Sequence, residues 1–138
     1  MLNWTSDVPT GSQILFESIV VNHLRSVENP RYLEVGVYVG TSIATIATLL
    51  PNAECVGIDN WGLSDAECTL CESIGQQSVT ADVIKNTYHR NTSHLKNVVL
   101  IEGDSATVLL DMIATQKAKM LQSATMTMTQ RLNKTHRI

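Results

Sequence analysis

The segment from residue 31 to residue 59 constrains the fold more than any other part of this chain. An apolar run, 31–35, ends at Gly36; a stripe of apolar residues at helical spacing follows to Leu50; and a second apolar run, 54–58, ends at Asp59. Two strands joined by one helix of this length are the sequence form of a right-handed βαβ crossover. The pattern therefore predicts a parallel sheet with ligand-binding loops after its strands.

The flanking segments extend this pattern in both directions. Apolar residues recur at helical spacing from residue 12 to 27, Thr80 opens a polar helix, and residues 97–101 form the clearest strand, followed by Gly103 and a further helix. We predict an α/β fold with a parallel sheet and flanking helices. Residues 1–118 would form this domain, and residues 119–138 a basic tail of uncertain structure. Thr125–Thr129 would be either an edge strand or part of a frayed or partly helical end.

Composition narrows the class of protein. The chain of 138 residues has room for one domain, and its net charge of −3 and pI near 5.7 give no general attraction to phosphate backbones, so we expect no nucleic-acid partner. No secretory signal and no run of roughly 18 apolar residues is present, so we expect no membrane partner. Three cysteines suit a reducing compartment. We expect a soluble cytoplasmic protein.

Two glycines four residues apart separate the first strand from its helix. Gly36 permits a tight turn or a close backbone approach, and Gly40 lets helix and strand pack closely and leaves room for a ligand. Asp59, at the tip of the adjacent strand, can accept both hydroxyl hydrogens of a ribose that lies across the strand ends. Alternatively, these residues have purely structural roles: the glycines form a turn, and Asp59 caps a helix.

The residues between these glycines bear on the choice of cofactor. Nicotinamide cofactors need three glycines spaced G-x-G-x-x-G, whereas Val37, Tyr38 and Val39 fill the intervening positions. A pyrophosphate would meet side chains there, which disfavours a nicotinamide-dependent oxidoreductase. S-adenosylmethionine has no phosphate, and this glycine spacing is adequate for it.

Three motifs together resemble those of class I methyltransferases. They are LEVGVYVGTS from Leu33, GIDNW around Asp59, and IEGDS from Ile101. The chain is most similar to the small-molecule O-methyltransferase branch over residues 8–113. The resemblance implies a Rossmann-like fold, truncated after its third strand-helix unit. It also implies S-adenosylmethionine as cofactor and methyl transfer to a small-molecule acceptor, with a hydroxyl as one acceptor group.

The resemblance also assigns the residues around the methionine part of the cofactor. Glu34, Gly36 and Tyr38 would line that side of the site. Gly40 would complete the glycine loop, and Ser42 would lie near the cofactor carboxylate at a helix N-terminus. Thr41 or Ser42 is also the expected cap of that helix.

The nucleoside part of the cofactor would meet residues from the next two strands. Asp59 would hold the ribose, and Trp61 would either cover the adenine or pack under the following loop. Asp104 and Ser105 would meet the adenine edge, where a carboxylate can accept from the exocyclic amine.

The acceptor side of the family's site has no counterpart. In the resembled branch an acidic stretch after a fourth strand binds a divalent metal in many members, whereas this chain has no acidic residue beyond Asp111. We therefore predict no metal ligand and assign no catalytic residue. Cys68 and Cys71 have zinc-knuckle spacing without a second pair, and His89 and His94, five residues apart, are expected to face solvent.

Two hypotheses follow from these residues. The first is an S-adenosylmethionine-dependent methyltransferase. The second is an inactive, truncated methyltransferase-like fragment or interaction module. Without a fourth strand, the first strand would leave an apolar edge unpaired, and such an edge pairs readily with a partner or with a second copy in a homo-oligomer.

Overall fold

The computed structural model describes residues 11–62 and 80–135 of the chain. The chain divides into two compact units, Met1–Asp104 and Ser105–Ile138. The described elements of the first unit are α1 (Gly11–Arg25), β1 (Arg31–Val35), α2 (Thr41–Leu49), β2 (Glu54–Asp59), α4 (Ala81–Thr92) and β3 (Val98–Glu102). The second unit contains α5 (Ser105–Thr135). Cys68 and Cys71, the zinc candidates, lie outside the described residues.

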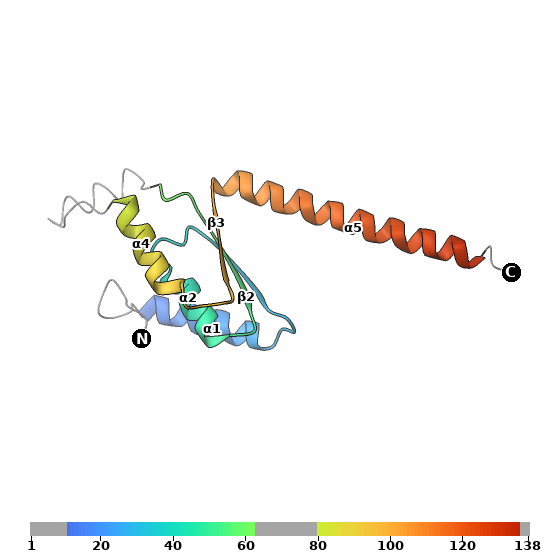
Figure 1. Ribbon diagram of the computed structural model, residues 1–138. Helices are drawn as coiled ribbons and strands as arrows, with labels where there is room; N and C mark the ends of the chain where they lie inside the picture. The colour runs from blue at the N-terminus through green and yellow to red at the C-terminus, as the bar shows by residue number, and fades with distance from the viewer. Residues whose placement is uncertain (1–10, 63–79, 136–138) are drawn as a thin grey trace. The chain divides into compact units, whose positions relative to one another are not determined.

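The first unit contains a three-stranded parallel sheet in the order β1-β2-β3 (Figure 1). Leu33 of β1 is in register with Val56 of β2, which is in register with Val99 of β3. Each strand is joined to the next by a segment that contains a helix, α2 and then α4. The prediction of an α/β fold with a parallel sheet and flanking helices is confirmed.

The core lies between one face of this sheet and the helices α1, α2 and α4. Alternate residues of a strand point to opposite faces, so the face with Tyr32 and Cys55 turns toward the helices. Ile43 and Ile46 of α2 are fully buried in this core, and each contributes roughly 1.5–3 kcal/mol through burial. The other buried hydrophobic members are Val21, Leu24, Val37, Ala47, Leu50, Ala53 and Tyr88.

Both ends of α2 are fixed by backbone and amide contacts. Its N-cap is Gly40, at φ 76°, with no side-chain capping hydrogen bond, so the expected cap by Thr41 or Ser42 is wrong. The turn into the helix needs a left-handed residue at this position, which favours glycine over a hydroxyl side chain. At the other end Asn97 Nδ2 donates to the carbonyls of Ala47, Leu50 and Ala53 at 3.0–3.1 Å.

The basic tail is part of one long helix. α5 runs without a break across residues 118 and 119, and Thr125 Oγ1 donates to the carbonyl of Leu121, as in a helix. The alternative of an edge strand over Thr125–Thr129 is therefore wrong. The preceding residues 114–124 are mostly good helix formers. Because an existing helix extends more readily than a new element forms, it continues through Thr125–Thr129 although Thr and Met alternate there with the period of a strand. Among the described residues, no helix is both long and apolar enough to span a membrane.

Candidate functional site

The candidate site lies at the carboxyl ends of the three parallel strands, where open α/β sheets form their ligand crevices. Backbone hydrogen bonds extend the sheet into the loops at this end. Gly36 N–H donates to Ile58 O at 2.8 Å, and Gly103 N–H donates to Asp59 O at 3.0 Å. The loops that carry the sequence motifs are therefore fixed to neighbouring strands.

The glycine loop alternates between core and solvent. Val37 and Val39 are buried, at 3% and 7% exposure, whereas Tyr38 between them is 45% exposed. Gly36 has φ +80°, and a Cβ added to it would meet no atom within 4 Å. Gly36 is thus required by backbone conformation and faces open space.

Gly40 has a packing role that the motif alone does not reveal. A Cβ added there would lie 2.6 Å from Tyr88 Cδ2 and 3.3 Å from Thr92 Cγ2, both on α4. On the same helix, Asn91 Nδ2 donates to Val39 O at 2.8 Å. The close packing expected of Gly40 is thus made with α4, which fixes the glycine loop from the side of the core.

Asp59 joins the loops that follow β1 and β2. Its Oδ2 accepts the backbone N–H of Tyr38 at 3.0 Å, and its Oδ1 accepts the backbone N–H of Trp61 at 2.7 Å. A carboxylate oxygen has two lone pairs, so each oxygen keeps one acceptor position beyond these bonds. The structure thus brings together three of the predicted site residues, Tyr38, Asp59 and Trp61.

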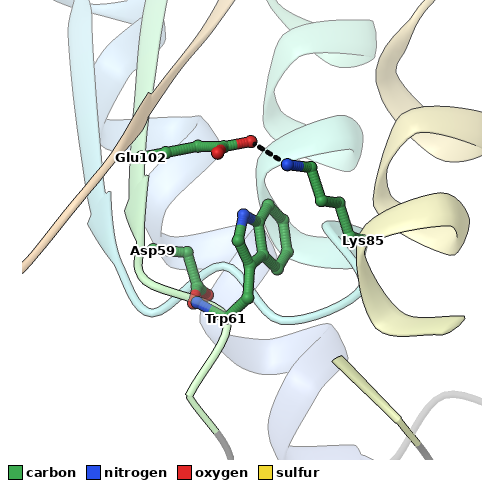
Figure 2. A network of polar contacts seen from close by, with 4 residues as sticks. All are labelled: Asp59, Trp61, Lys85 and Glu102. Atoms are coloured by element: carbon green, nitrogen blue, oxygen red, sulfur yellow. Dashed lines mark hydrogen bonds and ion pairs between the residues drawn. The ribbon is translucent and has the colours of Figure 1, made fainter. Parts of the chain in front are cut away.

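Trp61 packs against α4 and lies close to an ion pair. Its ring meets Tyr88 edge-on, with centroids 5.5 Å apart, and Lys85 Nζ lies 6.0 Å from the Trp61 centroid. Lys85 Nζ pairs with Glu102 Oε1 at 2.6 Å, and this bond lowers the pKa of Glu102 (Figure 2). The indole therefore packs against α4, whereas the expected alternative of packing under the following loop concerns residues 63–79, outside the described residues.

Glu34 is a largely buried carboxyl on the helix-covered face of β1. The Tyr32 hydroxyl donates to Glu34 Oε2 at 2.8 Å. The pKa of Glu34 is raised to about 7, mainly by burial; the Tyr32 hydrogen bond offsets part of the rise, and the nearby Glu17 adds to it. Burial also raises the pKa of Tyr32. Glu34 is thus partly protonated at neutral pH.

The remaining predicted residues lie at element ends. Ser42 is the second residue of α2 and is partly buried. Asp104 is exposed and follows β3 as the last residue of the first unit, whereas Ser105 begins α5 in the second unit. Both predicted histidines are exposed, as expected: His89 in the last turn of α4 and His94 just after it.

Several residues that shape this site were missed in the sequence. Glu17 is only 8% exposed, but a search for helical periodicity assigns only apolar residues to the buried face of a helix and therefore passes over it. Tyr88 belongs to the apolar stripe expected for this helix, but that stripe leaves out the polar Asn91, three positions further on the same face of α4. The ion pair between Lys85 and Glu102 could not be predicted, because no sequence pattern shows that a residue of a helix lies next to the end of a given strand.

Comparisons with known proteins do not assign the chain to a family. No protein-family model matches the chain, and a search of curated proteins found no match. The resemblance to class I methyltransferases thus stays a prediction from the three sequence motifs. Among the residues that the structure describes, no group of three or more His, Cys, Asp or Glu side chains is placed to hold a metal ion.

Proposed function

We propose that the first unit binds S-adenosylmethionine and serves an enzyme that transfers its methyl group to a small-molecule acceptor. One observation carries this proposal. Two carboxylates, Glu34 and Asp59, lie on the same face of adjacent parallel strands near their carboxyl ends, beside the open, left-handed Gly36. This is a suitable arrangement for a ligand with an ammonium group at one end and a ribose at the other.

The donor and acceptor chemistry of these residues suits that cofactor. An ionised Glu34 can accept from the ammonium group of the methionine part, and the remaining lone pairs of Asp59 can accept ribose hydroxyls. Ser42 and the first backbone N–H groups of α2 can meet a carboxylate. A pyrophosphate is less well served, because Tyr38 fills the position of the middle glycine in the nicotinamide fingerprint.

The residues in this unit would act by orientation. The bound cofactor supplies an activated methyl group, and methyl transfer is an in-line displacement that needs alignment of acceptor and donor. Glu34 and Asp59 would fix the two ends of the cofactor relative to the sheet. We assign no proton acceptor to the unit, and hydroxyl compounds are the first acceptor class to test.

Calorimetric titration with S-adenosylhomocysteine tests the proposal. The folded wild-type protein should bind it, and Asp59→Ala should weaken binding at least tenfold, with NAD as a competitor that binds more weakly. Asp82→Ala is the matched control, because Asp82 is an exposed carboxylate in the first turn of α4. A folded wild-type protein that gives no binding heat would overturn the proposal.

A second candidate function, a protein-interaction module, is favoured by the edge of the sheet. Among the described strands β1 pairs only with β2, and its residues Leu33 and Val35 are 44% and 50% exposed. An unpaired apolar edge can accept a strand from a partner or a second copy. Sedimentation of wild type and Val35→Lys tests this candidate: self-association lost in the variant supports it, and a monomeric wild type excludes the second copy.

We place either function in the cytoplasm. Cys55 is a fully buried free thiol, and burial raises its pKa to about 11. A free thiol of this kind suits a reducing compartment.

A further inference from the structure

We infer that Asp59 is a positioning residue that holds the loops after β1 and β2 in their left-handed conformations, whether or not a ligand is bound. The two hydrogen bonds to its carboxylate, from Tyr38 N–H at 3.0 Å and Trp61 N–H at 2.7 Å, join one residue of each loop. This role goes beyond the proposed recognition of a ribose. It requires no cofactor.

Backbone conformation explains why these two residues need an acceptor. Among the described residues, Asn29, Tyr38 and Trp61 are the non-glycine residues with positive φ, at 53°, 50° and 57°. Asparagine adopts this region readily, whereas an aromatic residue does so at a steric cost. Both aromatic residues, and not Asn29, donate to Asp59. A charged acceptor makes stronger hydrogen bonds than a neutral one, which suits it to offset this cost.

The loops after β1 and β2 are both bonded to the Asp59 carboxylate but differ in their surroundings. Tyr38 is exposed in the glycine loop, beside Gly36, whereas the Trp61 ring lies against Tyr88. Figure 2 shows the Trp61 ring between Asp59 and Lys85. Because one carboxylate holds both backbones, losing it should release both loops together. If the proposed cofactor binds between these loops, its affinity depends on Asp59 through loop position as well as through direct contact.

Amide hydrogen exchange tests the anchor directly, without any ligand. Asp59→Asn retains one carbonyl oxygen and replaces the other with a donor, so at least one of the two amides must lose its acceptor. We expect the Tyr38 or the Trp61 amide to exchange at least tenfold faster in the folded variant. Asn60→Ala is the matched control, because Asn60 Oδ1 accepts the N–H of Gly62, at 2.9 Å, within its own turn. Equal exchange rates in wild type and Asp59→Asn would overturn the inference.

A glycine substitution separates positioning from a general loss of stability. Glycine adopts positive φ without steric cost, so Tyr38→Gly should make Asp59→Asn less damaging. We expect Asp59→Asn to change the unfolding equilibrium constant at least threefold less in the Tyr38→Gly background than in wild type. Asn29→Gly is the control, because Asn29 is also left-handed but precedes β1, at the opposite end of the parallel sheet from Asp59. Equal effects in all three backgrounds would contradict the inference. If Asp59→Asn alone does not fold, a folded Tyr38→Gly/Asp59→Asn double variant would support the inference, and a double variant that also fails to fold would contradict it.

The consequence for ligand binding rests on the proposed function. If Asp59 positions the glycine loop, Asp59→Asn should reduce the affinity for S-adenosylhomocysteine by a smaller factor in the Tyr38→Gly background than in wild type. An equal factor in both backgrounds would mean that Asp59 acts on the ligand by direct contact alone. If no variant and no wild type binds the compound, the proposed function fails, whereas the exchange and coupling measurements still decide the role of Asp59.

Discussion

Replacing Glu34 with glutamine removes a carboxyl that the fold holds partly protonated at neutral pH. Its pKa rises from 4.5 to about 7, mainly through burial and in smaller part through the nearby Glu17. Because the folded pKa lies above the unfolded value, the folded state binds the proton more tightly than the unfolded state. Wild-type stability should therefore fall as pH rises from about 4.5 to about 7 and then level off.

The magnitude follows from the same shift. At about 1.4 kcal/mol for each pH unit, the rise from 4.5 to about 7 corresponds to about 3 kcal/mol of folding free energy. Glutamine cannot ionise and can still accept from the Tyr32 hydroxyl, so Glu34→Gln should lack this loss. The variant should match wild type below about pH 4, and its advantage should grow by about 2–3 kcal/mol between pH 5 and pH 8.

Urea unfolding at pH 5 and pH 8 measures this difference, with tryptophan fluorescence as the probe. Ionisable groups common to both proteins cancel when the two unfolding free energies are subtracted. A difference between wild type and Glu34→Gln that stays constant from pH 5 to pH 8 would refute the assignment of Glu34 as a buried carboxyl with a raised pKa.

Three further predictions concern the supports of the site. Gly40→Ala should lower the unfolding free energy by about 2–4 kcal/mol in chemical denaturation, because the added Cβ would lie 2.6 Å from Tyr88. Gly36→Ala should lower it by only about 1–2 kcal/mol, from backbone strain alone. Equal losses would contradict the packing of Gly40 against Tyr88. Asn97→Ala should lower the unfolding free energy by about 1–3 kcal/mol, because three carbonyls lose their shared donor; an unchanged urea midpoint would contradict this. Lys85→Met should raise the pKa of Glu102 toward its usual value in an NMR titration, with little change in stability for so exposed a pair.

The strands could be predicted from the sequence to within about one residue. Buried parallel strands are continuous apolar runs, and each run is followed by a polar or glycine residue at the sheet edge that carries the site. The prediction of a run at 31–35 matches β1, and those at 54–58 and 97–101 differ from β2 and β3 by one residue at their ends. Local pattern sufficed because these strands are short and bounded by clear breaks.

The contacts that hold the candidate site could not be predicted in this way. The partners of Asp59 are backbone N–H groups, which every residue except proline carries, so no side-chain pattern marks them. The packing of Gly40 against Tyr88 joins residues 48 positions apart along the chain. In α5, by contrast, a local pattern was present but misleading: Thr125–Thr129 alternate with the period of a strand and yet lie within a continuous helix.

The central claim, that the first unit is built to bind S-adenosylmethionine, is tested most directly by amide NMR spectra recorded during titration with S-adenosylhomocysteine. We predict saturable shifts at Gly36, Tyr38 and Trp61, which flank the carboxyl ends of β1 and β2, and no shift at Asn29 or His94 at the opposite end of the sheet. A well-folded spectrum that does not change at any concentration of the compound would contradict the claim.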